Sequence, residues 1–191
     1  MIATPACLFL LHVGGNIWYK NRIGVVTLFG NLLERARLKS AHLVCAGEAL
    51  SGEQRDTIAE FGMADRVHEL VSPTSVILRA LYNSADALLF ISLEEGFGWP
   101  IVEAQACGCP VITSDREPMR SIAGPAGFFV DPENLNEASS LIDGHWDWIT
   151  GQRSASIENA ERFSEARAAE RYAALYREVL KGGRSTHVNG L

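Results

Sequence analysis

Six short apolar runs alternate with segments of helical periodicity, and this alternation constrains the fold more than any other feature of the chain. The run at 87–91, Ala-Leu-Leu-Phe-Ile, is apolar at every position, which is typical of a strand covered on both faces of a parallel sheet. Between the first two runs, 20–39 carries apolar side chains at helical spacing. The alternation predicts a doubly wound α/β fold, a parallel sheet of about six strands with helices on both faces. The predicted strands are 8–13, 41–46, 66–70, 86–92, 110–114 and 127–130.

Helix and domain boundaries follow from shorter signals. Ser72-Pro73 predicts a helix start, with the serine as cap and the proline at the first helical position. Two further helices are predicted near 135–149 and 155–180. We expect 1–180 to form a single domain and 181–191, which is polar and glycine-rich, to form a flexible tail.

The charge balance argues against one class of partner. The chain has 17 Lys and Arg residues against 23 Asp and Glu residues, a formal net charge of -6. A general nucleic-acid binder would present a basic face, so we expect no nucleic acid as partner. No apolar run approaches the roughly 18 residues of a membrane span. The apolar start at 6–11 could pass for part of a signal peptide, but it lacks preceding basic residues, and a buried strand is the preferred interpretation.

The four cysteines, Cys7, Cys45, Cys107 and Cys109, are interpreted as small buried hydrophobic side chains. Cys107 and Cys109 have no second cysteine or histidine pair at the spacing of a zinc site. Free thiols are typical of a reducing compartment, which favours a cytoplasmic location.

Two glutamates, Glu95 and Glu103, flank a loop and a helix start that suit a phosphorylated sugar. The seven residues between them are Gly-Phe-Gly-Trp-Pro-Ile-Val. Gly96 and Gly98 allow backbone conformations and close approaches that a Cβ would prevent, and Pro100 suits a first helical turn. The free amides of that turn favour an anion such as phosphate. Carboxylates on either side can accept hydrogen bonds from sugar hydroxyls.

This segment resembles the Glu-(seven residues)-Glu signature of retaining glycosyltransferases of the GT-B fold, family 4 (group 1) in particular. The resemblance continues through 104–114, Ala-Gln-Ala-Cys-Gly-Cys-Pro-Val-Ile-Thr-Ser, and 127–132, Gly-Phe-Phe-Val-Asp-Pro. It covers nearly the whole chain up to about residue 180, and it corresponds to the C-terminal, donor-binding domain of that family. A single Rossmann-like GT-B half is therefore the expected architecture.

The resemblance implies a role for each matching residue. Glu95 would contact the donor sugar and Lys20 would neutralise the donor diphosphate, which makes these two the candidate catalytic residues. Glu103 would hold the ribose hydroxyls, and Trp99 could be either core packing or a wall of the site. The complete set of candidate donor-binding residues is Gly14, Gly15, Lys20, Gly47, Glu95, Gly96, Phe97, Gly98 and Glu103.

The sequence departs from the family pattern at Gly15 and Ser121. The family usually has arginine at position 15, five residues before the lysine, as a second phosphate clamp. Its loss should weaken donor binding unless Arg22 or another group substitutes, although Arg22 could equally be a solvated helix residue. Near Ser121 the family often has glutamate, and this loss is expected to matter less.

The resemblance implies a domain that binds a UDP- or GDP-linked sugar for hexosyl transfer with retention of configuration. We expect no acceptor domain within the chain. The isolated chain would therefore be inactive without an N-terminal acceptor domain or subunit. Any peripheral membrane contact would come through that acceptor domain or subunit. The chain has no Asp-x-Asp motif, so neither a metal nor another cofactor is expected. The main alternative is a non-catalytic nucleotide-sugar-binding or interaction module. A GT-B sugar-nucleotide epimerase is a second alternative, which the segment from Glu95 to Glu103 disfavours.

Overall fold

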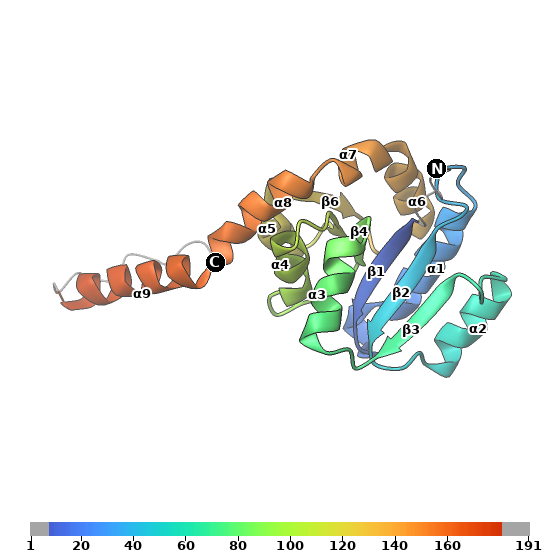
Figure 1. Cartoon of the computed structure of the whole chain (residues 1–191), viewed down its shortest axis with the longest axis horizontal. Helices are drawn as coiled ribbons and strands as arrows, with labels where there is room; N and C mark the ends of the chain where they lie inside the picture. Colours follow the sequence, from blue (N-terminus) through green and yellow to red (C-terminus); the bar gives the residue numbers. More distant parts are fainter. Residues whose placement is uncertain (1–7, 181–191) are drawn as a thin grey trace, which may run out of the picture.

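A single sheet of six parallel strands lies at the centre of the computed structural model, which describes residues 8–180. The strand order is β3-β2-β1-β4-β5-β6 (Figure 1). All six predicted strands are confirmed, with bounds that shift by at most two residues, and the doubly wound α/β fold is confirmed with them. The strands are β1 (Phe9–Gly14), β2 (His42–Gly47), β3 (Val67–Val71), β4 (Ala87–Phe90), β5 (Val111–Ser114) and β6 (Gly127–Val130).

The strand order reverses its direction between β1 and β4. From β1 the chain adds β2 and β3 on one side, and then β4, β5 and β6 on the other. Strand β1 therefore pairs in parallel with both β2 and β4. In doubly wound sheets, ligands bind in the crevice outside the carboxyl ends of the strands at such a reversal. The loops after β1 and β4 are thus the first place to look for a site.

Two hydrophobic clusters cover the two faces of the sheet. Neighbouring strand residues point to opposite faces, so Leu10 belongs to one cluster and Leu11 to the other. This is why the predicted strands are apolar at nearly every position. One cluster takes side chains from α1 (Arg22–Leu33), α2 (Gly52–Glu60), α6 (Leu135–Gly144) and α7 (Trp146–Thr150). The other takes them from α3 (Ser75–Ser84), α4 (Trp99–Ala106) and α5 (Met119–Ala123).

The C-terminal part differs from the prediction because each expected helix is divided. The region 135–149 forms α6 and α7, which are separated at His145. The region 155–180 forms α8 (Arg153–Ala160), a short 3-10 turn η3 (Glu161–Phe163) and α9 (Glu165–Leu180). Ser164 has an extended backbone, and its hydroxyl accepts a hydrogen bond from Arg167 N at 3.4 Å, which begins a new helix there. Helix α9 has no buried residue and extends away from the rest of the protein (Figure 1).

The predicted start of α3 is wrong by two residues. Thr74, not Ser72, is the cap, since its hydroxyl accepts from Ile77 N at 3.4 Å. Ser72 has a left-handed backbone (φ 48°), and its N–H donates to Gly47 O at 2.7 Å. That long-range bond ties the end of β3 to the end of β2, so the helix begins only after the turn it creates.

Helix α1 is shorter than its predicted span of 20–39. It follows a 3-10 turn, η1 (Trp18–Lys20), and Asn21 separates the two with a left-handed backbone (φ 50°). A further 3-10 turn, η2 (Gly124–Ala126), precedes β6.

The cysteine predictions are supported where they can be followed. Cys45 and Cys109 are buried, and burial raises the pKa of the Cys45 thiol to about 11 and that of Cys109 to about 12. Cys107 is partly buried. Cys7 and the predicted tail at 181–191 lie outside the described residues. Between residues 8 and 180, no helix is both long and apolar enough to cross a membrane.

Candidate functional site

The loops after β1 and β4 meet at the strand reversal. Leu93 N, just beyond β4, donates to Tyr19 O in η1 at 2.7 Å. The next residue of η1, Lys20, places its Nζ 2.6 Å from Glu95 Oε1. The two side chains are 19% and 7% exposed, so the ion pair is largely shielded from water. The structure thus brings together the two predicted catalytic residues from distant parts of the sequence.

Further contacts hold this ion pair in place. Ser92, fully buried at the end of β4, donates its hydroxyl to Glu95 Oε1 at 2.9 Å. The hydroxyl of Ser114 in turn donates to Ser92 O at 2.5 Å. Lys20 Nζ lies 5.3 Å from the ring centroid of Phe90, a cation–π contact. A positive charge is therefore fixed at the carboxyl end of β4.

The start of α4 lies on the same loop. Gly98 precedes the helix with φ 101° and ψ 44°, a conformation that L side chains rarely adopt. Pro100 lies in the first turn, as predicted. Within the described residues no side chain caps this end. Pro100 has no N–H, and Ile101 N donates to Gly98 O at 2.9 Å, so Trp99 carries the first-turn amide that could donate to a ligand. An anion placed here would meet both the helix dipole and the nearby Lys20. By contrast, a Cβ at Gly96 would meet nothing within 4 Å, so packing does not require glycine there.

Glu103 lies one turn further along α4 and contacts a residue that the sequence interpretation missed. The Tyr82 hydroxyl, from α3, donates to Glu103 Oε2 at 3.0 Å. Tyr82 is 2% exposed, and burial, followed by the charge of Glu103, raises its pKa. The hydroxyl therefore stays protonated and orients the exposed carboxylate. Tyr82 lies four residues after Leu78 on the inner side of α3, so helical spacing could have identified it only as a core residue.

The ends of β1 and β2 approach each other through glycine. Gly47 has φ 131°, and a Cβ there would lie 2.1 Å from Gly14 O, so no other residue fits. At Gly15, a Cβ would lie 2.9 Å from Glu48 Oε1. An arginine at position 15 would therefore meet the Glu48 carboxylate before it met any phosphate.

Arg22 is not the solvated helix residue that one interpretation allowed. It is 2% exposed, and its Nη1 donates to Asn16 Oδ1 at 3.2 Å and to Glu48 O at 2.7 Å. Gln54 Nε2 also donates to Asn16 Oδ1, at 3.0 Å. Through these hydrogen bonds, the buried Arg22 connects the loop after β1 to the loop after β2.

His12 lies fully buried in β1. Burial is the main cause that lowers its pKa to about 4, with smaller contributions from Arg22 and Lys20. The ring is thus neutral at pH 7, and Nδ1 carries the proton donated to Leu89 O at 3.1 Å. In the part of the chain from 8 to 180, no group of three or more His, Cys, Asp or Glu side chains is arranged to hold a metal ion.

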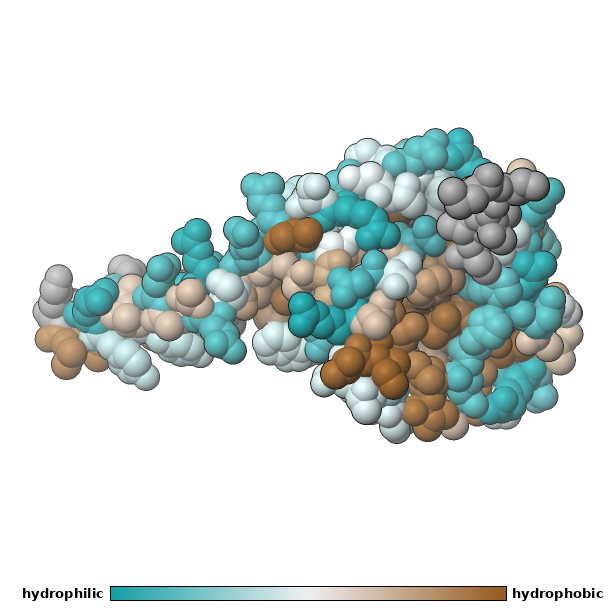
Figure 2. Space-filling model, viewed as in Figure 1, coloured by the Kyte–Doolittle hydropathy of each residue, from teal (hydrophilic) through white to brown (hydrophobic). Residues whose placement is uncertain are grey.

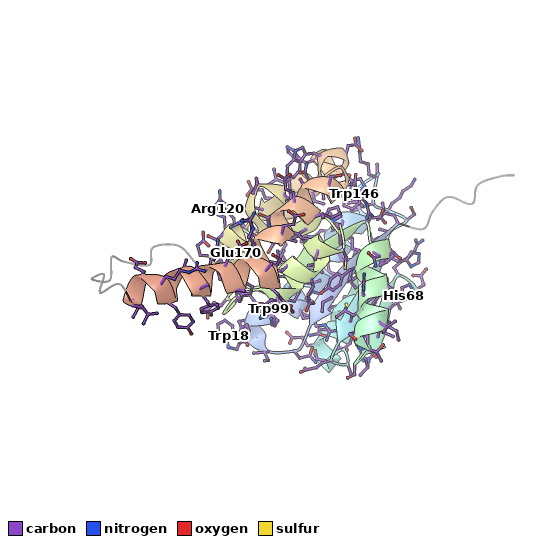
Figure 3. The ribbon with its side chains drawn as sticks, turned by 60° about the vertical axis from the view of Figure 1, so that its left-hand side comes forward. Trp18, His68, Trp99, Arg120, Trp146 and Glu170 are labelled. Carbon is purple, nitrogen blue, oxygen red and sulfur yellow. The ribbon has the colours of Figure 1, made fainter. Side chains whose placement is uncertain are left out.

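Two exposed tryptophans lie on the segments that carry the ion pair: Trp18 is in η1 with Lys20, and Trp99 begins α4 after Glu95. Trp99 is 61% exposed and Trp18 is 67% exposed, and Figure 3 shows them on the same side of the molecule. The Trp99 ring lies 4.8 Å from that of Phe97. The structure therefore excludes the core interpretation of Trp99 and leaves its ring available at the edge of the site.

Ser121, the second position at which the sequence departs from the family pattern, is exposed on α5.

Comparisons with known proteins give a consistent family and fold. The family described as "Glycosyl transferases group 1" matches residues 8–167. A D-inositol 3-phosphate glycosyltransferase of Mycolicibacterium smegmatis is 32% identical over 153 residues, which cover 76% of this chain and 35% of the relative. A GDP-mannose:cellobiosyl-diphosphopolyprenol alpha-mannosyltransferase of Komagataeibacter xylinus is 30% identical over 125 residues, which cover 62% of this chain and 32% of the relative. The chain thus spans about a third of the length of these relatives.

Solved structures share the fold at lower sequence identity. Sucrose-phosphate synthase from Thermosynechococcus elongatus has a TM-score of 0.78 and 23% identity, over 94% of this chain and 47% of that protein. The pneumococcal O-GlcNAc transferase, solved with UDP and GlcNAc, has a TM-score of 0.77 and 18% identity, over 92% of this chain and 36% of that protein.

Proposed function

The chain belongs to the group 1 glycosyl transferases, and from this premise we propose that residues 8–180 form the donor-binding part of a retaining hexosyltransferase. The donor would be a nucleoside-diphosphate sugar. The observation that carries the proposal is the shielded Lys20–Glu95 pair beside the uncapped start of α4, at the strand reversal. A cation, a helix N-terminus and a carboxylate in one crevice supply what a sugar diphosphate needs.

In the proposed reaction, the bond between the anomeric carbon and the diphosphate oxygen breaks, and the electron pair leaves with the diphosphate. Lys20 and the positive end of the α4 dipole, with the Trp99 N–H, then stabilise the developing negative charge. Lys20 would turn from Glu95 towards the phosphates, and Glu95 would contact the sugar hydroxyls. A phosphate oxygen of the donor is a suitable acceptor for the proton of the incoming hydroxyl, so Glu95 need not act as a nucleophile.

The nucleoside would extend from this crevice towards β2 and β3. Glu103 would accept hydrogen bonds from the ribose hydroxyls, with Tyr82 orienting its carboxylate. The glycines at 14, 15 and 47 would let the backbone approach the nucleotide closely. A nucleotide-linked sugar donor is supported by one relative that carries GDP-mannose in its name, and it agrees with one protein of the same fold that was solved with UDP. Transfer itself, with its acceptor, is proposed for the whole protein, because the chain spans only about a third of the length of its relatives.

Calorimetric titration of the 191-residue chain with GDP, UDP and ADP tests the proposal. We expect saturable binding of at least one diphosphate. Lys20→Ala should weaken diphosphate binding far more than binding of the matching nucleoside, because its proposed partner is phosphate. Lys39→Ala, at an exposed lysine outside the site, is the matched control. If no diphosphate binds, or if Lys20→Ala behaves as the control does, the donor site is wrongly placed.

The non-catalytic alternative makes the same binding prediction. Transfer of sugar by the full-length protein, lost in Lys20→Ala, would favour the enzyme. Tight nucleotide-sugar binding by a full-length protein that transfers nothing to a panel of sugar acceptors would favour the binding module.

A further inference from the structure

A cavity beyond the phosphate crevice has the lining expected of a nucleobase pocket. It lies at the carboxyl ends of β1, β2 and β3, beside the start of α3, and has a volume of about 340 Å³. Ligand pockets are mostly apolar, with a few polar groups that fix orientation. The lining fits that description: Val13, Gly14, Gly15, Ala46, Gly47, Glu48, Ser72, Pro73 and Leu78.

Apolar surface continues beside this cavity. Figure 2 shows hydrophobic residues gathered at the lower end of α3, where Val76 is 77% exposed and Ile77 is 45% exposed. A flat aromatic base placed in the cavity would therefore have apolar surface beside it as well as beneath it.

Of the described residues that line the cavity, Glu48 alone is charged. Its Oε2 accepts a hydrogen bond from Asn16 N at 2.9 Å, and its own backbone oxygen is held by the buried Arg22 at 2.7 Å. Asn16 is fixed in turn, because its Nδ2 donates to Ala49 O at 2.7 Å. Within residues 8–180, Glu48 Oε1 accepts no hydrogen bond. The pocket thus presents a positioned carboxylate with spare acceptor capacity.

An ionised carboxylate can only accept hydrogen bonds, so it repels phosphate and favours N–H or O–H donors. In the proposed site the ribose hydroxyls already donate to Glu103. The base is therefore the part of the nucleotide that remains to donate to Glu48. Guanine offers two adjacent donors on one edge, N1–H and the exocyclic N2 amino group. Uracil offers a single N3–H between two carbonyl oxygens, and adenine places the acceptor N1 beside its amino group. Only guanine can face both carboxylate oxygens without repulsion.

We propose that Glu48 recognises the N1–H and N2 amino edge of guanine, so that the sugar donor is linked to GDP. The inference rests on the proposed function, because it names the base that the donor site takes. It assigns to Glu48 a specificity role that the Glu95 and Glu103 signature does not contain.

The test compares GDP, IDP, UDP and ADP in calorimetric titrations of the 191-residue chain. IDP lacks only the N2 amino group, so it isolates the proposed contact. We expect GDP to bind at least about tenfold more tightly than IDP, which is the effect of one hydrogen bond to a charged group. UDP and ADP should bind more weakly than GDP by a similar or larger factor.

A pair of variants locates the effect. Glu48→Gln keeps the size of the side chain but replaces one acceptor oxygen with a donor, and it should bring the affinities for GDP and IDP close together. Glu53→Gln, at an exposed position in the first turn of α2 outside the cavity, is the matched control and should preserve the preference for GDP.

The outcomes separate this inference from the donor-site proposal. Equal affinity of the wild-type chain for GDP and IDP, or tighter binding of UDP or ADP, overturns the inference while the donor site stands. If Glu48→Gln tightens all four diphosphates by the same factor, Glu48 acts as a repelling charge near phosphate and the inference is wrong. If none of the four binds, the proposed function fails and the inference fails with it.

Discussion

The Lys20–Glu95 contact predicts that Glu95→Gln tightens the binding of a nucleoside diphosphate. The ammonium and the carboxylate lie 2.6 Å apart. In the proposed function the donor diphosphate needs the same ammonium, so Glu95 and the phosphates compete for it. Glutamine keeps the shape of the side chain and can still accept the hydrogen bond from Ser92, but it releases the charge of Lys20.

The expected size follows from the shielding of the pair. A hydrogen bond to a charged group contributes about 1.5–3 kcal/mol. The lysine side chain is 19% exposed, and the glutamine oxygen would still accept one of its hydrogen bonds, so only part of this is released. We expect about 1 kcal/mol, or roughly fivefold tighter binding of GDP or UDP. Binding of the nucleosides guanosine and uridine should not change.

The assay is calorimetric titration at two salt concentrations, with Glu94→Gln as the control. Glu94 is the neighbouring exposed glutamate, and its removal changes the net charge by the same amount. Tightening seen equally in both variants would reflect the net charge and not the ion pair. Weaker diphosphate binding by Glu95→Gln would refute the competition, as would an equal change in nucleoside binding.

Three further predictions concern other residues. Glu103→Ala should weaken binding of the diphosphate and its nucleoside alike, by about tenfold, and an effect on the diphosphate alone in calorimetry would contradict the ribose assignment. Gly47→Ala should lower the free energy of unfolding by about 3 kcal/mol in chemical denaturation, because its Cβ would lie 2.1 Å from a backbone oxygen of β1. Gly52→Ala is the control: its Cβ would meet nothing within 4 Å, so the free energy of unfolding should stay unchanged. Stability should fall as the pH drops from 6.5 to about 4, because the unfolded chain protonates His12 first and the folded protein keeps it neutral. The lowered pKa of His12 corresponds to about 3 kcal/mol of stability. In denaturation across this pH range, the free energy of unfolding should fall less in His12→Gln than in a variant of the exposed His145.

Local patterns were sufficient to predict the strands and the start of α4. A fully apolar strand has the same appearance wherever it lies in a parallel sheet, so its existence can be inferred without knowing its neighbours. The segment from Gly98 to Pro100 likewise carries its own conformational preferences, and the observed φ of 101° at Gly98 agrees with them. The start of α3 was mispredicted because the hydrogen bond from Ser72 to Gly47 comes from a distant strand.

The sequence by itself determined the strands, their order along the chain and the family, because these depend on local periodicity, glycine and proline positions and an ordered motif. Only the tertiary structure decided which side chains meet. The pairing of Lys20 with Glu95 requires β1 and β4 to be neighbours, which the strand order alone establishes. The burial of Arg22 and the position of Glu48 over Gly15 likewise depend on two loops that lie side by side because β1 pairs with β2. Such contacts arise from packing between distant segments, and no local pattern encodes them.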